Sequence, residues 1–118
     1  MIHASVRMKF VPGKFAEARD ILLALVEPTQ FTPGCLGCDI YQDLRERYVL
    51  LFEQWWETQA DLDRYLRSDP YRSVILAMEM ATEHPLIRFS DISRSAGLET
   101  IERARSVLLS DEQIASWP

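Results

Sequence analysis

The 118-residue sequence has few of the residues from which metal, cofactor and disulfide sites are built. It contains two cysteines, Cys35 and Cys38, and two histidines, His3 and His84. These four residues supply neither a disulfide framework nor a zinc-ligand motif. The four glycines form no Gly-rich dinucleotide loop. We therefore expect no bound metal and no cofactor.

Positive charge and long apolar runs are scarce as well. Thirteen basic residues stand against eighteen acidic ones, a net charge of −5, so no positive field attracts a nucleic acid. No run approaches the ~20 apolar residues that span a bilayer, and the first residues do not read as a signal peptide. The sequence predicts a cytoplasmic protein that binds neither nucleic acid nor membrane, with a single core.

The C-x-x-C spacing of the two cysteines is typical of redox sites when it opens a helix. Here it lies in a segment that reads as a strand, Cys35 to Gln42. Because side chains three apart on a strand point to opposite faces, we expect the two sulfurs to diverge. The simpler interpretation is two small, half-buried strand residues.

The rest of the chain alternates between strand and helix patterns. Strict alternation over 2–10 predicts a strand with one buried face, and apolar residues at three- and four-residue steps from Phe15 to Val26 predict a helix. We expect that helix to end before Pro28 or to fray toward Phe31. A third strand over 48–56 is apolar on both faces, so helices must cover one side and a partner subunit, or more of this chain, the other.

Two short helices and a last strand follow. Thr58 and Asp61 resemble a capping box for a helix reaching Leu66. Asp69 is expected to cap a second helix, with Pro70 in its first position. The residues expected to form the buried stripe of this second helix are Val74, Ile75, Met78 and Ala81. Pro85 ends it, and 86–92 predicts a fourth strand.

This order predicts an α+β, ferredoxin-like split β-α-β fold with a four-stranded antiparallel sheet over residues 1–94. Residues 95–118 form a C-terminal helical extension. Its first helix is expected to carry Leu98, Ile101, Ala104 and Leu108, packed on the sheet edge or on a partner. A second short helix is expected to carry Ile114 and Trp117.

Several segments resemble the antibiotic biosynthesis monooxygenase, or quinol monooxygenase, family of dimeric α+β barrels. They are Pro12-Gly13, the run 33–37, and above all 52–58 followed by 62–69. The resemblance implies a homodimer whose sheets face each other, and a pocket between sheet and helices. It also implies oxygenation of a quinol-like or polyketide aromatic by O₂ without metal or flavin. Such a reaction needs a stabilised substrate anion and exclusion of water.

The candidate site residues follow from the aromatic-rich junction between the two short helices. Those expected to be catalytic are Tyr65, Arg72 and Tyr71, and those expected to bind substrate are Trp56, Trp55 and His84. Tyr65 can equally be a core tyrosine, and Arg72 a solvated cation. Trp55 and Trp56 point to opposite faces of their strand.

Two other functions stay open. A stress-type barrel of the same fold would bind a ligand in this pocket without turning it over. A haem-degrading member would carry an Asn, a Trp and a His where this sequence has Val6, Tyr65 and Ile75. Haem degradation by that route is therefore not expected, although His84 or Tyr65 could serve as another axial ligand.

Overall fold

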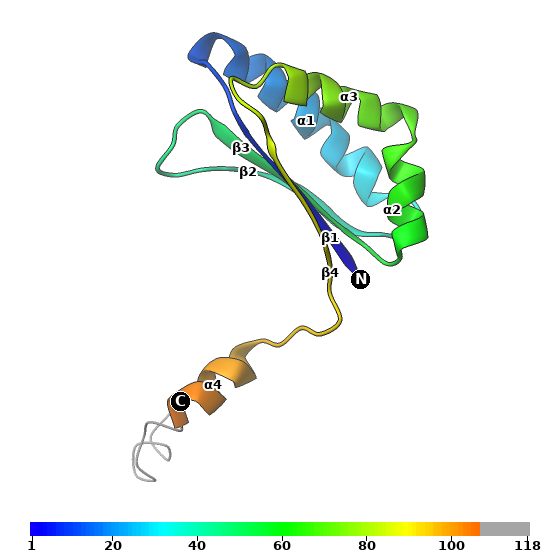
Figure 1. The fold of residues 1–118 in the computed structure, drawn as a ribbon, viewed down its shortest axis with the longest axis vertical. Coiled ribbons are helices and arrows are strands. Elements are labelled where there is room, and N and C mark those ends of the chain that lie inside the picture. The colour runs from blue at the N-terminus through cyan, green and yellow to red at the C-terminus, as the bar shows by residue number, and fades with distance from the viewer. Residues whose placement is uncertain (107–118) are drawn as a thin grey trace.

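The computed structural model describes residues 1–106 and contains four strands and four helices in this range (Figure 1). In chain order they are β1 (Ile2–Lys9), α1 (Pro12–Gln30), β2 (Cys35–Gln42), β3 (Val49–Trp56), α2 (Gln59–Leu66), α3 (Asp69–Glu79), β4 (Leu86–Asp91) and α4 (Leu98–Ser106). Within this range no helix is both long and apolar enough to cross a membrane.

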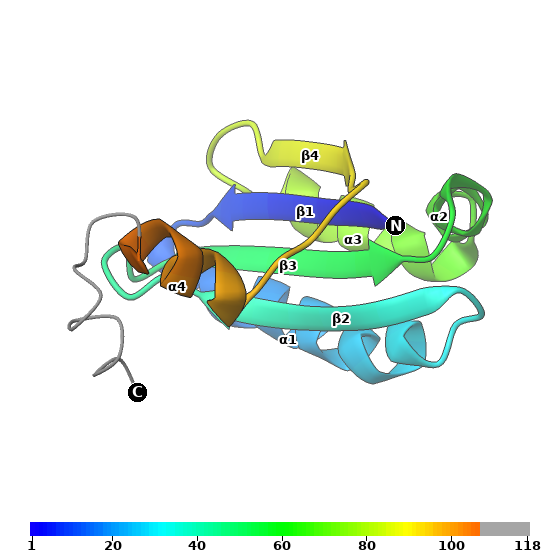
Figure 2. The same ribbon diagram turned by 90° about the horizontal axis from the view of Figure 1, so that it is seen from below.

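The strands form one antiparallel sheet in the order β2-β3-β1-β4. α1, α2 and α3 cover one face, and the opposite face is free of these helices (Figures 1 and 2). The predicted α+β, ferredoxin-like class is confirmed. Alternate residues of β1, from Ile2 to Met8, are buried against the helices, as their period of two predicts.

The helix boundaries agree with the prediction at one place and differ at another. α1 extends to Gln30 with Phe31 as its C-cap, which agrees with the expected extension toward Phe31 and not with an end before Pro28. A proline near the end of a helix removes only one backbone hydrogen bond. α3 begins one residue earlier than expected, with Ser68 in the N-cap position and Asp69 already helical. The expected side-chain cap by Asp69 is therefore wrong.

The buried stripe of α3 agrees with the prediction at Val74, and Met78 and Ala81 pack against the core as expected. The prediction is wrong at Ile75, which is 42% exposed, and it left out Tyr71, which is buried. At about 100° per residue, positions 71 and 77 lie about 60° from Val74 around the helix, whereas position 75 lies about 100° away. Tyr71 thereby enters the core beside α2.

The two cysteines do not diverge as the strand pattern predicts. A β-bulge between Cys35 and Gly37 changes the register, so Cys35 pairs with Trp56 and Cys38 with Gln54. Those two partners lie two residues apart on β3 and face the same side of the sheet. Both thiols therefore face the helices and pack in the core, where they remain free cysteines. The inserted residue, invisible to a period-two argument, explains the correction.

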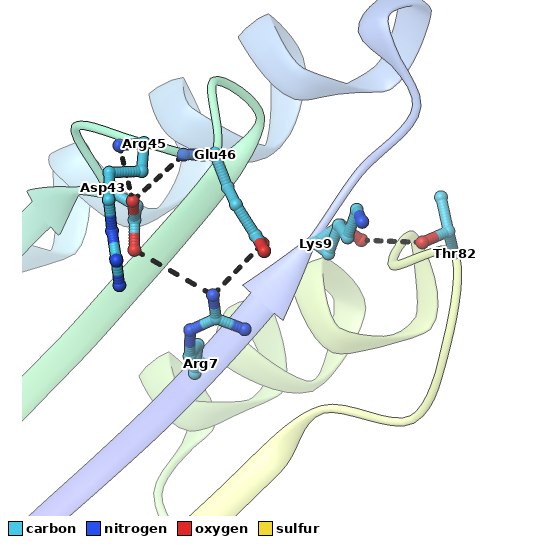
Figure 3. Close-up of polar contacts among 6 residues, drawn as sticks. All are labelled: Arg7, Lys9, Asp43, Arg45, Glu46 and Thr82. Atoms are coloured by element: carbon cyan, nitrogen blue, oxygen red, sulfur yellow. Dashed lines mark hydrogen bonds and ion pairs between the residues drawn. The ribbon is translucent and has the colours of Figure 1, made fainter.

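Arg7 on the uncovered face joins β1 to the β2–β3 connection (Figure 3). Its guanidinium lies 3.1 Å from a Glu46 carboxylate oxygen and 3.8 Å from one of Asp43. The other Asp43 oxygen accepts backbone N–H groups of Arg45 at 2.7 Å and Glu46 at 2.9 Å. These bonds close the turn and hold the pKa of Asp43 below its usual value, with a smaller contribution from Arg7.

The predicted helix in the C-terminal extension is present as α4. No residue of α4 is buried, and Leu98 and Ile101 are 65% and 54% exposed. It leaves the sheet on the side opposite to α1, α2 and α3 (Figure 1), so the expected packing on this chain's own sheet edge is not found. Leu108 and the second predicted helix, with Ile114 and Trp117, lie outside the described residues.

Candidate functional site

A cavity of about 260 Å³ lies where the end of α1 meets α2 and the start of α3. Its lining residues come from these three helices and their connections: Pro28, Thr29, Thr32, Arg64, Tyr65, Ser68 and Pro70. The sequence brings them together because α1 continues past Pro28 while the break between α2 and α3 falls at Ser68. Tyr65 is the one predicted site residue that lines this cavity.

Behind the lining, three aromatic rings form a continuous wall. Trp56 on β3 and Tyr65 on α2 have ring centroids 4.8 Å apart, and Tyr71 on α3 meets Tyr65 edge-on at 5.3 Å. All three residues are buried. The sequence interpretation placed them in one site, and the structure brings them into contact.

Two buried polar atoms in this wall lack a hydrogen-bond partner among the described residues, Tyr65 Oη and Trp56 Nε1. Thr29 is the polar neighbour that contributes most to lowering the pKa of Tyr65, but no bond of acceptable geometry joins its hydroxyl to Tyr65 Oη. A buried donor left unpaired costs about 1–3 kcal/mol. Such atoms are characteristic of places where a ligand or an ordered water supplies the acceptor.

The titratable groups of this wall are neutral at physiological pH. Burial raises the pKa of the Cys38 thiol to about 12, and it also raises the pKa of the Cys35 thiol. Burial also lifts the pKa of Tyr65 and of Tyr71 above the usual tyrosine value. The phenols and thiols therefore act as hydrogen-bond donors and not as bases.

Arg64 at the edge of the cavity is the only cation among its lining residues. Its guanidinium lies 3.0 Å from Asp61, whose other oxygen accepts the Thr58 hydroxyl at 2.8 Å. Asp61 also packs against Gly34, whose positive φ of 85° turns the chain from α1 into β2. A Cβ at position 34 would collide with the Asp61 carboxylate.

Three predicted site residues lie elsewhere. Arg72 has a side chain 83% exposed, lies 3.9 Å from Asp69 and is not among the residues that line the cavity. Trp55 is on the uncovered face of the sheet, where its ring stacks on His3 with centroids 4.1 Å apart. His84 is exposed after α3 and lines a separate cavity of about 160 Å³ together with Arg7 and Lys9.

A second small cavity of about 210 Å³ lies at β2, the strand at one edge of the sheet, and is lined by Gln30, Gly37, Cys38, Asp39, Tyr41, Glu53 and Trp55. A carboxylate oxygen of Glu53 lies 2.9 Å from His3 Nε2. The described residues hold no group of three or more His, Cys, Asp or Glu side chains arranged for a metal ion.

Sequence reasoning missed Thr29 and Arg64. Thr29 follows Pro28, before which α1 was expected to end or beyond which it was expected to fray, so nothing placed Thr29 in the core. The sequence does indicate that Arg64 pairs with Asp61, because residues three apart on a helix lie on the same side of it. The missing information was which side faces the cavity.

The family model for antibiotic biosynthesis monooxygenases matches residues 1–75, well over half of the chain. The chain belongs to the antibiotic biosynthesis monooxygenase family. The match includes β1 through α2 and much of α3, and so contains every residue that lines the cavity between α1, α2 and the start of α3. No curated protein matches the chain significantly.

Solved structures support the family assignment at the level of the fold. A Deinococcus radiodurans protein named for the same family superposes with a TM-score of 0.76 at 16% identity, over 83% of this chain and 98% of its own. Rv0793 from Mycobacterium tuberculosis superposes with a TM-score of 0.71 at 22% identity, and the match covers 81% of this chain and 98% of Rv0793. A conserved protein from Methanosarcina mazei Go1 superposes with a TM-score of 0.70 at 24% identity, and the match covers 75% of this chain and 89% of that protein. The antibiotic biosynthesis monooxygenase fold is thus shared by proteins of very different sequence.

Proposed function

We propose that this family member is a cofactor-independent monooxygenase that oxidises a small quinol-like aromatic with O₂. The observation that supports it best is the pairing of an aromatic wall with unpartnered donors, Tyr65 Oη and Trp56 Nε1, beside a cavity. Aromatic rings recognise a flat substrate, and fixed donors stabilise the oxyanion on which the reaction depends.

The atoms and electrons of this reaction balance without an added reductant. A phenolate gives one electron to O₂, and the resulting pair combines to form a carbon–oxygen bond at the ring. Protonation of the bound oxygen and loss of water then leave a carbonyl, so a phenol plus O₂ becomes a quinone plus water. The substrate's own four electrons reduce O₂, one oxygen atom entering the product and the other leaving as water.

The size of the cavity favours a quinol over a fused polyketide. A cavity of about 150 Å³ engineered in another protein holds one benzene molecule, so about 260 Å³ suits one or two rings. Arg64 at the edge is positioned to attract the anionic substrate. Tyr65, Tyr71 and Trp56 are the residues we assign to this site.

We further propose that the protein acts as a homodimer joined through the sheet face that α1, α2 and α3 leave uncovered. That face carries Trp55 stacked on His3, together with half-buried Leu51 and exposed Leu86. An aromatic and aliphatic surface of this kind is typical of an interface. The two free thiols are compatible with a reducing compartment such as the cytoplasm.

The decisive experiment is O₂ uptake by chelator-treated protein with a panel of hydroquinones and anthrones, corrected for autoxidation with heat-denatured protein. Uptake above the control, with one oxygen atom of ¹⁸O₂ recovered in the product, is the expected result. A panel member that raises the melting temperature without any O₂ uptake would instead favour the ligand-binding alternative.

A further inference from the structure

Figure 2 looks onto the face of the sheet that α1, α2 and α3 leave uncovered. Strand pairing aligns four residues of this face in one row, which runs from β2 through β3 and β1 to β4: Asp39, Glu53, Ser5 and Arg88. Ser5 points away from the helices because its two neighbours on β1 are buried against them, and residues paired across strands share a face. The row is thus acidic at its β2 end and basic at its β4 end.

The two carboxylates at the acidic end lie directly opposite each other on neighbouring strands, an arrangement that destabilises a sheet. Asp39 accepts the backbone N–H of Ile40 at 2.9 Å, and Glu53 lies 2.9 Å from His3 Nε2. No lysine or arginine among residues 1–106 forms an ion pair with either carboxylate. A second molecule that brings a cation to this end of the row therefore relieves the repulsion.

The acidic end of the row has room for such a cation. The cavity of about 210 Å³ at β2 is lined by Asp39 and Glu53 together with the rings of Tyr41 and Trp55. Aromatic rings beside carboxylates suit an arginine, because its planar guanidinium stacks on rings and donates hydrogen bonds to carboxylate oxygens. The acidic end is thus suited to an arginine side chain from another molecule.

Arg88 at the basic end of the row has no acidic partner within its own subunit. Its side chain is exposed, and it forms no ion pair with any of residues 1–106. Three strand spacings of about 4.8 Å, roughly 14 Å in all, separate Arg88 from Asp39 across the sheet. An ion pair between the two ends of the row therefore requires two molecules.

The symmetry of a dimer decides which charges meet. When two copies stack face to face about a two-fold axis parallel to the strands, β2 of one subunit lies over β4 of the other, and the row meets its own reverse. Asp39 then faces Arg88 of the second copy, and this contact occurs twice. A two-fold axis across the strands instead places β2 on β2 and β4 on β4, which brings charges of the same sign together. Because like charges opposed across an interface disfavour association, the charges select the first arrangement.

The neighbouring row of the same face agrees with this arrangement. In the order from β2 to β4 it contains Tyr41, Leu51, Arg7 and Leu86. Its two end residues are exposed, Tyr41 by 48% and Leu86 by 65%. The axis parallel to the strands places these two side chains against each other across the interface, and removing their apolar surface from water favours the dimer.

We propose that two copies of this chain dock through their uncovered sheet faces about a two-fold axis parallel to the strands, with Arg88 of each subunit paired with Asp39 of the other. Sheets packed face to face lie about 10 Å apart, a distance that these two side chains span together. The inference rests on the proposed homodimer, and it adds the orientation of the two subunits and the ion pair that fixes this orientation.

Charge reversal tests the ion pair. The dimer affinity of the full chain is measured by analytical ultracentrifugation for Arg88→Asp and for Asp39→Arg. We expect each variant to weaken the dimer at least about thirtyfold, because each dimer then holds two contacts between like charges. The matched controls Arg67→Asp and Asp20→Arg reverse exposed charges in the helix layer, and they should change the dimer affinity less than about threefold.

Mixing the two variants tests the orientation. A heterodimer of Arg88→Asp with Asp39→Arg holds one native pair and one reversed pair, so we expect it to form with an affinity within about threefold of the wild-type value. Recovery of the affinity in this mixture also shows that both variants are folded. A heterodimer of Arg88→Asp with wild type holds one native pair and one contact between like charges, and it should recover less.

The ion pair and the other proposals fail separately. Wild-type affinity in both variants, or no recovery in their mixture, would overturn the ion pair and leave the homodimer in place. Stronger association of Arg88→Asp with wild type than with Asp39→Arg would overturn the orientation, because it would place the two Arg88 side chains opposite each other. A wild-type chain that stays monomeric would overturn the homodimer and the ion pair together. An absence of O₂ uptake with every quinol would overturn the oxygenase function alone.

Discussion

Trp56 and Tyr65 pack ring against ring with planes inclined by 30°, and each buries a polar atom that no described residue satisfies. They come from different layers, Trp56 from the sheet and Tyr65 from α2. Two unpaired donors in one contact are a standing cost to the fold of about 1–3 kcal/mol each. Of the two residues, Tyr65 alone lines the cavity, so this contact joins the core of the fold to the candidate site.

Replacing Tyr65 with Phe should therefore separate stability from activity. The variant loses an unsatisfied hydroxyl and keeps the ring, so we expect its free energy of unfolding to stay equal or rise by up to about 1–2 kcal/mol. Turnover of an active quinol should fall by at least about tenfold, because the anion loses a donor. Urea unfolding and O₂ uptake measure the two quantities, and a large loss of stability would show that the hydroxyl is paired in solution.

The two arginines near the α2–α3 junction should behave differently. Arg64 lines the cavity, whereas Arg72 is exposed and lies 3.9 Å from Asp69. We expect Arg64→Gln to raise KM about tenfold through weaker attraction of the anion. Arg72→Gln should leave kcat and KM within about twofold, since an exposed ion pair contributes little. Equal effects of both changes would place Arg72 in the site, as the sequence suggested.

The sequence predicted the fold well because period-two and three-to-four-residue patterns report directly on which face of an element is buried. It also placed Tyr65 on an inward helix face, but it could not decide which of Trp55 and Trp56 faces the helices, because neighbouring strand residues point to opposite sides and both faces of that strand are apolar. The cysteines escaped this reasoning because a bulge at residues 35–37 depends on pairing with β3. Thr29 escaped it because the continuation of α1 past Pro28 depends on contacts beyond the local sequence.

Gly34 should be intolerant of a side chain. Its φ of 85° is strained for any residue with a Cβ, and that atom would collide with Asp61. We expect Gly34→Ala to lower the free energy of unfolding by about 1–3 kcal/mol. Gly13→Ala, in the first turn of α1 with open space around it, is the control and should be neutral or stabilising by up to about 1 kcal/mol. Similar unfolding midpoints for the two variants would contradict the assigned backbone conformation.

The Asp43 turn should make stability depend on pH. The folded state lowers the pKa of Asp43, mainly through the backbone N–H groups of Glu46 and Arg45. Its stabilising contribution is therefore present above the unfolded-state pKa and is lost as pH falls through the folded-state value. We expect Asp43→Ala to lower the urea midpoint at pH 7 and the difference from wild type to narrow toward pH 3. Asp20→Ala is the control for the loss of one negative charge. If the difference in urea midpoint between Asp43→Ala and wild type stays constant with pH, the effect comes from packing and not from the ionised carboxylate.

α4 should contribute to the proposed homodimer and not to the stability of its own subunit. Leu98 and Ile101 are exposed, and α4 lies on the side of the uncovered sheet face. A second copy docked on that face is positioned to cover these two side chains. We expect Leu98→Glu with Ile101→Glu to weaken the dimer at least about tenfold in sedimentation experiments, because buried charge without a partner opposes association. Leu44→Glu, at a fully exposed position of the β2–β3 connection, is the control and should leave the dimer affinity unchanged. Equal dimer affinities of the α4 variant and this control would show that α4 is not part of the interface.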